Sequence, residues 1–275
     1  NNRAHMNDIL LINTNNALKA DFFEKAKKTI SAYENEYVKF DFQTINLSDE
    51  NVIEKAKSAN AILFFASDKQ EELAVDSIRK QLGLYAQITA FSRRNDDVNH
   101  GFCIVQDKNG GIYEGEKGFA NNAAFGREAY DVERYSELEI ERTARVAYEL
   151  ANDSRRTLTL ADKADKLTTS KLWRKIVADV NEDYPFVSVD MQDVSATVDA
   201  IISNPTSLDV VVTTALFGDI LTQTAKSCLG ETPSISYVCD TPLAMYGFVQ
   251  TSAREIPSVE SLIRFMLKNS FGIEK

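Results

Sequence analysis

The stretch Ala61-Ile62-Leu63-Phe64-Phe65 decides the fold class, because all five residues are apolar. A short run without polar alternation is typical of a strand that is buried on both faces of a parallel sheet. Strands are also predicted over residues 9–12 and 37–47. Helices are predicted over residues 17–35 and from Ser48, whose side chain is suited to a helix N-cap. Strands that alternate with helices in this way predict an α/β sheet.

The middle of the chain changes character before it returns to a helix. Residues 88–109 are irregular, and residues 92–100 read as a polar loop. Residues 110–134 carry glycine and aromatic residues without helical spacing, which predicts an extended hairpin or arm. A helix then follows Ser136, because a serine with a glutamate at position 139 matches a capping box.

The last third of the chain repeats the strand–helix rhythm. Three further strands and four further helices are predicted from apolar runs and helical spacing. The strands fall at residues 157–160, 186–189 and 208–212, and the helices at residues 170–180, 196–203, from about 218 and 259–269.

Charge and composition exclude several classes of function. The net charge of −10 argues against nucleic acid or an anionic membrane as a partner. No apolar run is long enough to span a bilayer and no signal peptide is apparent, so a cytoplasmic protein is expected. Residues 1–6 read as a cloning remnant, which leaves His100 as the one native histidine. A histidine-based triad or zinc site is therefore excluded, and any catalysis must use Lys, Tyr, Asp, Glu or Cys.

Several motifs fall in a fixed order through the second half of the chain. They are Gly110-Gly111-Ile112-Tyr113, Asp162-Lys163-Ala164, Leu172-Trp173-Arg174, Asn204-Pro205 and Leu216-Phe217-Gly218-Asp219-Ile220-Leu221. In this order and spacing they resemble the isocitrate/isopropylmalate dehydrogenase family of metal-dependent β-hydroxyacid oxidative decarboxylases. The resemblance is greatest to the isopropylmalate branch, in a divergent and shortened form.

The resemblance implies a two-domain α/β/α fold with a mixed sheet and a dimer clasp arm. Residues 1–84 and 230–275 would form the large domain, and residues 85–229 a central domain that makes the dimer. Residues 110–134 would be the arm, exchanged between subunits of a homodimer. Each active site would then be shared, with its lysine supplied by the neighbouring chain.

The resemblance also implies a set of site residues. Lys163 would be the base and Tyr113 the acid in the oxidation and decarboxylation of a 2-hydroxy acid, with NAD(P) as oxidant. Arg79 would bind a substrate carboxylate. Mg²⁺ or Mn²⁺ would be held by aspartates, of which Asp219 is present and Asp193 is a candidate.

The chain departs from the family pattern at the metal and substrate positions. Gln223 stands four residues after Asp219, where the family has a second aspartate. Ser195 stands at the third, so Asp193 would serve only if the loop shifts. Thr89 and Gln106 occupy two of the three arginine positions of the substrate clamp. These changes predict weakened binding of metal and of a dianionic substrate.

The cofactor positions depart further. The glycine-rich turn of the family falls at residues 13–19, and the adenosine loop between Gly247 and Pro257, yet neither interval contains glycine. Without glycine the backbone approaches a diphosphate poorly, so no cofactor-binding residue is identified.

Three functions remain open from the sequence. The first is a dehydrogenase-like protein with a degraded cofactor and metal site, with little or no dehydrogenase activity and a role in binding or assembly, including assembly with a related protein. The second is an active NAD(P)- and metal-dependent oxidative decarboxylase of a small 2-hydroxy acid that uses Lys163, Tyr113 and Asp219. The third is a sensor of a small ligand or nucleotide.

Overall fold

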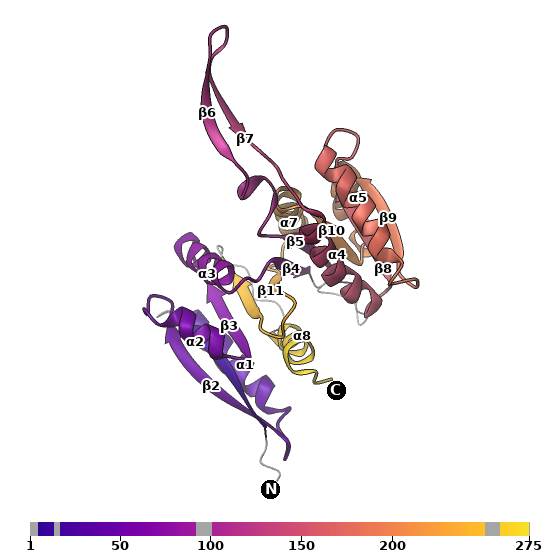
Figure 1. Ribbon diagram of the computed structural model, residues 1–275. Coiled ribbons are helices and arrows are strands. Elements are labelled where there is room, and N and C mark those ends of the chain that lie inside the picture. The colour runs from indigo at the N-terminus through magenta and orange to yellow at the C-terminus, as the bar shows by residue number, and fades with distance from the viewer. Residues whose placement is uncertain (1–4, 14–16, 92–100, 251–258, 275) are drawn as a thin grey trace. The chain divides into compact units, whose positions relative to one another are not determined.

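The computed structural model describes residues 5–13, 17–91, 101–250 and 259–274. The chain forms two compact units, coloured along the sequence in Figure 1. Residues 1–85 and 231–275 make the terminal unit, and residues 86–230 make the central unit. Each unit has its own strands and helices, and each is described by itself below.

The terminal unit is built on a mixed sheet that contains the predicted apolar strand. Its strand order is β2-β1-β3-β12-β11, with all pairs parallel except β11 and β12. All six residues of β3 are buried, which confirms the prediction for residues 61–65. The bounds are β1 His5–Asn13, β2 Val38–Asn46, β3 Ala61–Ala66, β11 Ser234–Val238 and β12 Met245–Val249.

Helices α1 Ala17–Ser31, α2 Val52–Ser58, α3 Lys69–Gln81 and α8 Val259–Phe271 cover this sheet. Helices α2 and α3 place Val52, Ala56, Val75 and Ile78 in one apolar core with the strands. Helix α1 packs against α8, and the Phe22 ring of α1 lies 5.6 Å from the rings of Phe65 and of Phe248. The apolar spacing that predicted α1 and α8 is therefore the face that each helix buries.

Five further strands lie in the central unit, in the order β4-β5-β10-β8-β9. Strands β5, β10, β8 and β9 run parallel, and β4 pairs antiparallel with β5. The bounds are β4 Ala86–Phe91, β5 Phe102–Asp107, β8 Thr157–Asp162, β9 Ser188–Asp193 and β10 Val210–Thr213. The strands and helices of the two units confirm the α/β class.

Four helices cover the sheet of the central unit in two pairs. Helices α6 Val194–Ser203 and α7 Ala215–Leu229 share an apolar core with the strands. Helices α4 Glu137–Asn152 and α5 Thr168–Asn181 pack together, and the Tyr148 hydroxyl donates to the Val177 carbonyl at 2.7 Å. The predicted capping box starts α4, because Ser136 and Glu139 each bond the backbone of the other. The helix predicted from about residue 218 begins three residues earlier.

An antiparallel hairpin projects from the central unit (Figure 1). Its strands are β6 Lys117–Asn122 and β7 Gly126–Asp131, and a 3-10 turn over Gly111–Tyr113 precedes them. All six residues of β7 are exposed, and the Phe119 and Phe125 side chains are more than four-fifths exposed. The hairpin predicted within residues 110–134 is therefore confirmed.

Two local predictions were wrong. Residues 88–109 include β5 and part of β4, strands that hide polar side chains and so lack the expected alternation. Helix α2 begins after Asn51 rather than after Ser48, because a turn intervenes. Residues 5 and 6, which were set aside as part of a remnant, pair with β2 as part of β1. The polar loop at 92–100, with His100, lies outside the described residues.

No helix among the described residues is both long enough and apolar enough to cross a bilayer.

Candidate active site

Polar residues of the central unit gather where its parallel strands end. Asp107, Asp162, Asp193 and Thr213 are the last residues of β5, β8, β9 and β10. Because these four strands are parallel, their carboxyl ends lie at one edge of the sheet, where α/β proteins bind ligands. Helix α7 starts just beyond that edge and carries Asp219 in its second turn.

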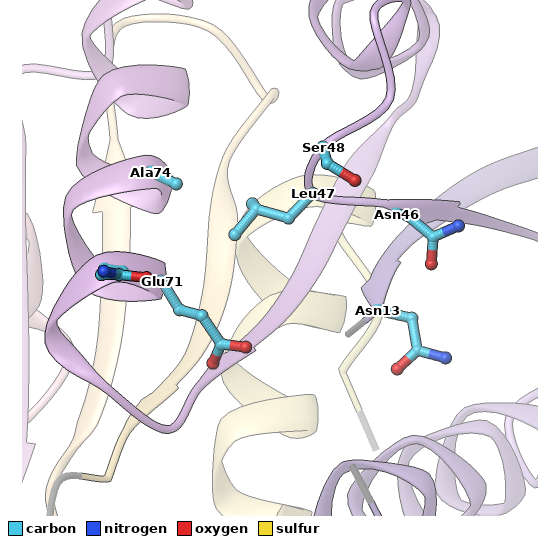
Figure 2. Close-up of a pocket in the computed structure, with 7 residues that line it drawn as sticks. Asn13, Asn46, Leu47, Ser48, Glu71 and Ala74 are labelled. Carbon is cyan, nitrogen blue, oxygen red and sulfur yellow. The ribbon is translucent and has the colours of Figure 1, made fainter. Parts of the chain in front are cut away.

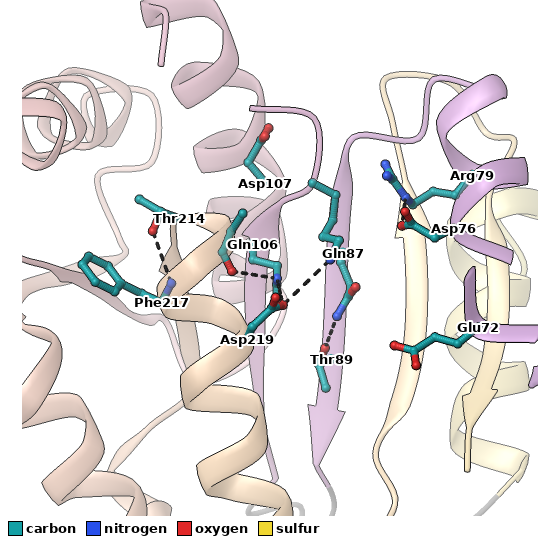
Figure 3. Close-up of polar contacts among 12 residues, drawn as sticks. Glu72, Asp76, Arg79, Gln87, Thr89, Gln106, Asp107, Thr214, Phe217 and Asp219 are labelled. Carbon is teal, nitrogen blue, oxygen red and sulfur yellow. Dashed lines mark hydrogen bonds and ion pairs between the residues drawn. The ribbon is translucent and has the colours of Figure 1, made fainter. Parts of the chain in front are cut away.

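Asp219 lies beside Gln106 at the end of β5 (Figure 3). The Gln106 Nε2 donates to its Oδ1 at 2.8 Å, and the Lys108 ammonium lies 3.8 Å from the same oxygen. The carboxylate is also near enough to the Tyr113 hydroxyl to raise the pKa of that group. We call Gln106, Lys108, Tyr113 and Asp219 the Asp219 cluster. In this cluster the candidate acid, Tyr113, stands near the candidate metal ligand, Asp219.

Gly218 allows the Asp219 cluster to form. A Cβ atom at this position would lie 2.6 Å from the Gln106 Cδ, which is closer than real carbon contacts. Helix α7 therefore needs a residue without a side chain where it passes β5. The Gln106 side chain is fully buried, and its Oε1 has no partner among the described residues.

Tyr113 keeps its proton at neutral pH. Partial burial, and then the neighbouring Asp219 carboxylate, raise the pKa of its hydroxyl to about 12. A protonated phenol can donate a proton, which is the direction that an acid needs. The side chain is 42% exposed, so a ligand can reach it within this unit.

The predicted base, Lys163, and the second candidate metal ligand, Asp193, form an ion pair. Asp193 ends β9 and caps α6, because its Oδ1 accepts the Ser195 backbone N–H at 2.8 Å. Asp165 is the second carboxylate near Lys163, at 3.5 Å. The bond to Asp193 raises the pKa of the Lys163 ammonium, and the same bond, with Ser195, lowers the pKa of Asp193. A lysine base needs a lowered pKa, so this arrangement holds the proton instead.

An ion pair between a buried aspartate and a half-exposed arginine fixes the loop that carries Lys163. The Arg174 guanidinium donates to Asp162 through two nitrogens, at 2.6 and 3.0 Å, and Asp162 is 1% exposed. Asp162 also accepts the Ala164 backbone N–H at 3.0 Å. We call Asp162, Lys163, Arg174 and Asp193 the Lys163 cluster. The sequence placed Asp162 and Arg174 in motifs without predicting that they bind each other.

Arg79 lies in the terminal unit and is occupied there. Its Nε donates to Asp76 at 2.8 Å, its Nη1 donates to the Leu84 carbonyl at 2.8 Å, and its guanidinium stands 5.8 Å from the Tyr237 ring centre. The side chain is 1% exposed. These contacts give Arg79 a packing role that the sequence did not predict, and its substrate role stays a prediction.

The two altered clamp positions are neutral and fully buried. Gln87 donates to the Thr89 hydroxyl at 2.9 Å, and Gln106 is bonded to Asp219 as described. Both Thr89 and Gln106 have no exposed surface. They satisfy neighbours within the sheet and bring no positive charge for a dianionic ligand.

The described residues do not fit a divalent metal at Asp219. Gln223, one turn on, donates to the Ser227 hydroxyl at 3.4 Å and adds no charge. No group of three His, Cys, Asp or Glu side chains in the described part of this chain could hold a metal ion. The groups that surround Asp219 are donors and an ammonium, whereas a hard cation requires further oxygen ligands.

A pocket of about 480 Å³ lies in the terminal unit, at the carboxyl ends of β1 and β2 (Figure 2). It is lined by Asn13, Asn46, Leu47, Ser48, Gln70, Glu71 and Ala74. Glu71 is the one charged residue among them, and it pairs at 2.5 Å with Lys19, which is 1% exposed. A diphosphate in this pocket would meet a carboxylate, so these residues do not fit the phosphates of NAD(P). Residues 14–16 and 251–257, within the two intervals where the cofactor loops of the family would fall, lie outside the described residues.

Lys108 and Gln106 are the contacts of Asp219 that the sequence did not predict. Gln106 was noted only as a lost arginine, and Lys108 was not singled out. The sequence feature that could have pointed to Lys108 is its charge, just after a strand and two positions before Gly110. Its partner, Asp219, however, lies 111 residues further along the chain. Spacing alone could not connect them.

Comparisons with known proteins agree with this geometry. Residues 15–260 match the sequence profile of the family described as isocitrate/isopropylmalate dehydrogenase. The chain is 36% identical to a 3-isopropylmalate dehydrogenase of Staphylococcus epidermidis, over 86% of this chain and 71% of the relative. It is 34% identical to that of Lactococcus lactis, over 82% and 72%.

Solved structures share the fold at lower identity. A β-decarboxylating dehydrogenase from Thermococcus kodakarensis matches with a TM-score of 0.79 and 22% identity, over 96% of this chain and 83% of the other. An isocitrate dehydrogenase from Methylococcus capsulatus matches with a TM-score of 0.73 and 22% identity, over 96% and 85%. Taken with the profile match and the relatives above 30% identity, these likenesses show that the chain belongs to the isocitrate/isopropylmalate dehydrogenase family.

Proposed function

We propose that this family member has little or no dehydrogenase activity and acts through binding or assembly. The observation that carries the proposal is the Lys163–Asp193 ion pair, because it opposes the base role of Lys163. The ammonium faces two carboxylates, Asp193 and Asp165, and its pKa is raised. At neutral pH the lysine is therefore protonated and cannot remove the hydroxyl proton of a 2-hydroxy acid.

The substrate and cofactor positions support the same proposal. Thr89 and Gln106 leave the central unit without two guanidinium groups that would hold a dianion. The pocket at the ends of β1 and β2 presents Glu71 where phosphates would need cations or free backbone N–H groups. A ligand of this site would therefore carry less negative charge than an alkylmalate or isocitrate.

Assembly is supported by the hairpin of β6 and β7. Its exposed Phe119 and Phe125 rings are apolar surface of the kind that another chain covers. We propose a homodimer as the first state to test, with a related family member as the second. A sedimentation mass of one chain would contradict both.

A second function, an active decarboxylating dehydrogenase of a small 2-hydroxy acid, is favoured by one observation. Burial and the nearby Asp219 carboxylate keep the proton on Tyr113, so the acid candidate stands near a carboxylate. If Mg²⁺ or Mn²⁺ and NAD(P) bind, they would supply charge stabilisation and hydride acceptance at this place. This chain would contribute the protonated Tyr113 and the position of Asp219.

The two functions separate in an absorbance assay of NADH and NADPH formation. The wild type is assayed with Mn²⁺, either nicotinamide cofactor, and malate, 3-alkylmalates, isocitrate and tartrate. We expect no turnover. Turnover that falls by about 10²–10⁴ in Lys163→Ala would support the enzyme instead. Lys166→Ala is the matched control, because Lys166 lies on the same loop but is exposed and pairs only with Asp165 at 3.8 Å.

A further inference from the structure

The Asp219 carboxylate already has a cation beside it. The Lys108 ammonium lies 3.8 Å from Oδ1, and its side chain is only 19% exposed, so the charge is held near the carboxylate. Gln106 donates to the same oxygen at 2.8 Å, so one acceptor position of the carboxylate is already filled beside the ammonium.

Two other carboxylates at strand ends of the central unit, Asp107 and Asp162, are already bonded to other side chains. Asp107 is fully buried and accepts from Thr143 at 3.1 Å, with the Arg142 guanidinium at 3.5 Å. Asp162 is bonded to Arg174 through two nitrogens. Each of these carboxylates is neutralised by an arginine, and Asp219 is the one of the three that has a lysine near it.

We propose that the Lys108 ammonium takes the place of the divalent cation beside Asp219, and that Lys108 is the residue that excludes the metal. An ammonium at this distance repels a divalent ion bound to the same oxygen, because the two positive charges would share one small and partly buried space. The inference rests on the proposed function in treating this as the same site. Weak metal binding would then have two causes. One is the absence of carboxylates at Gln223 and Ser195, and the other is the presence of the Lys108 ammonium.

Binding of Mn²⁺ by the full-length chain tests the inference without any need for turnover. Free Mn²⁺ is measured by electron paramagnetic resonance during titration of the wild type, Lys108→Met and Lys175→Met. Methionine keeps the length of the side chain and removes its charge. Lys175 is the matched control, since it is an exposed lysine paired with Asp179 at 2.6 Å on α5, remote in function from Asp219. Lys108→Gln is a second variant in case the first does not fold.

We expect Lys108→Met to bind Mn²⁺ at least about tenfold more tightly than the wild type, and Lys175→Met to match the wild type. Adding Asp219→Asn to Lys108→Met should abolish the gain. Equal binding by wild type and by both Lys108 variants would overturn the role of Lys108. If none of these proteins bound Mn²⁺, the proposed function would still be supported, because the missing carboxylates alone would explain the result. If all of them bound Mn²⁺ tightly and Asp219→Asn abolished that binding, the proposed loss of metal binding would be wrong as well.

Discussion

The Asp219 cluster and the Lys163 cluster each place a lysine near an aspartate, but they do so in different ways. Lys163 contacts Asp193 directly, and the contact moves the pKa of both groups in opposite directions. Lys108 stands 3.8 Å from Asp219, which has a neutral amide as its closer partner. A direct pair fixes the proton on its lysine, whereas the looser cluster mainly fixes the place of its carboxylate.

The surroundings of the two clusters also differ. The Lys163 cluster is framed by an arginine that grips a buried aspartate, and a helix cap holds its second aspartate. The Asp219 cluster depends on close packing of a helix glycine against a buried glutamine. The first is therefore held by charge and the second by shape, and three changes test this difference.

The largest expected effect comes from adding bulk at Gly218. Gly218→Val should lower the free energy of unfolding by about 3 kcal/mol, because its side chain overlaps the buried Gln106 and must push α7 from β5. Urea denaturation measures the change. Gln223→Ala, an exposed change one turn further along α7, is the control and should stay within about 0.5 kcal/mol. A Gly218→Val protein as stable as the control would show that shape is not what holds this cluster.

The next effect comes from removing the arginine of the Lys163 cluster. Arg174→Ala should cost about 2 kcal/mol of unfolding free energy, because Asp162 is left buried without its two charged donors. The loss should be smaller than for a fully buried pair, since the Arg174 side chain is 41% exposed. Lys175→Ala, which breaks an exposed pair on the same helix, should change stability by less than about 0.5 kcal/mol. Equal losses for the two variants would remove the distinction.

The smallest effect is expected at the Lys163–Asp193 pair, and it depends on pH. The pKa of Asp193 is lowered in the folded chain, so its contribution is present above its unfolded pKa of about 3.9 and is lost as pH falls through the folded value. The pKa of Lys163 is raised, so its contribution is present below about 10.4 and is lost as pH rises through the folded value. Asp193→Asn should therefore be less stable than the wild type at pH 7.

Urea denaturation of both proteins from pH 7 to pH 2.5 checks this sign. The difference between them should shrink toward the acid end, because Asp193 of the unfolded chain takes up a proton there while the folded chain still holds the carboxylate ionised. A difference that stays constant with pH would mean that Asp193 acts only as the neutral cap of α6. Asp165→Asn is the companion variant, since Asp165 meets the same lysine at 3.5 Å without capping a helix.

Much of the fold followed from local signals in the sequence. The apolar residues of β3, the capping box of Ser136 and the hairpin of β6 and β7 each depend on neighbours within a few positions. Strands β4 and β5 could not be predicted from local signals. They bury the polar side chains of Gln87, Thr89 and Gln106, whose partners are brought together only in the folded chain. An alternation of polar and apolar residues cannot predict a strand whose polar residues face inward.

The sequence motifs named candidate site residues but not their contacts. Motif order singled out Tyr113, Lys163 and Asp219, and the structure places Tyr113 in a 3-10 turn, Lys163 just after β8 and Asp219 in α7. It could not predict that Lys108 would meet Asp219, because that contact joins distant segments. The roles of these residues stay predictions until turnover and metal binding are measured.

The hairpin of β6 and β7 has a consequence for the lifetime of the chain. A two-stranded ribbon with no core of its own is marginally stable in water, and all six residues of β7 are exposed. Among the described segments it is where a protease would find extended backbone most easily. Cleavage there should slow as the protein becomes more concentrated if the ribbon docks on a second copy. The abundance of the chain would then regulate its own turnover.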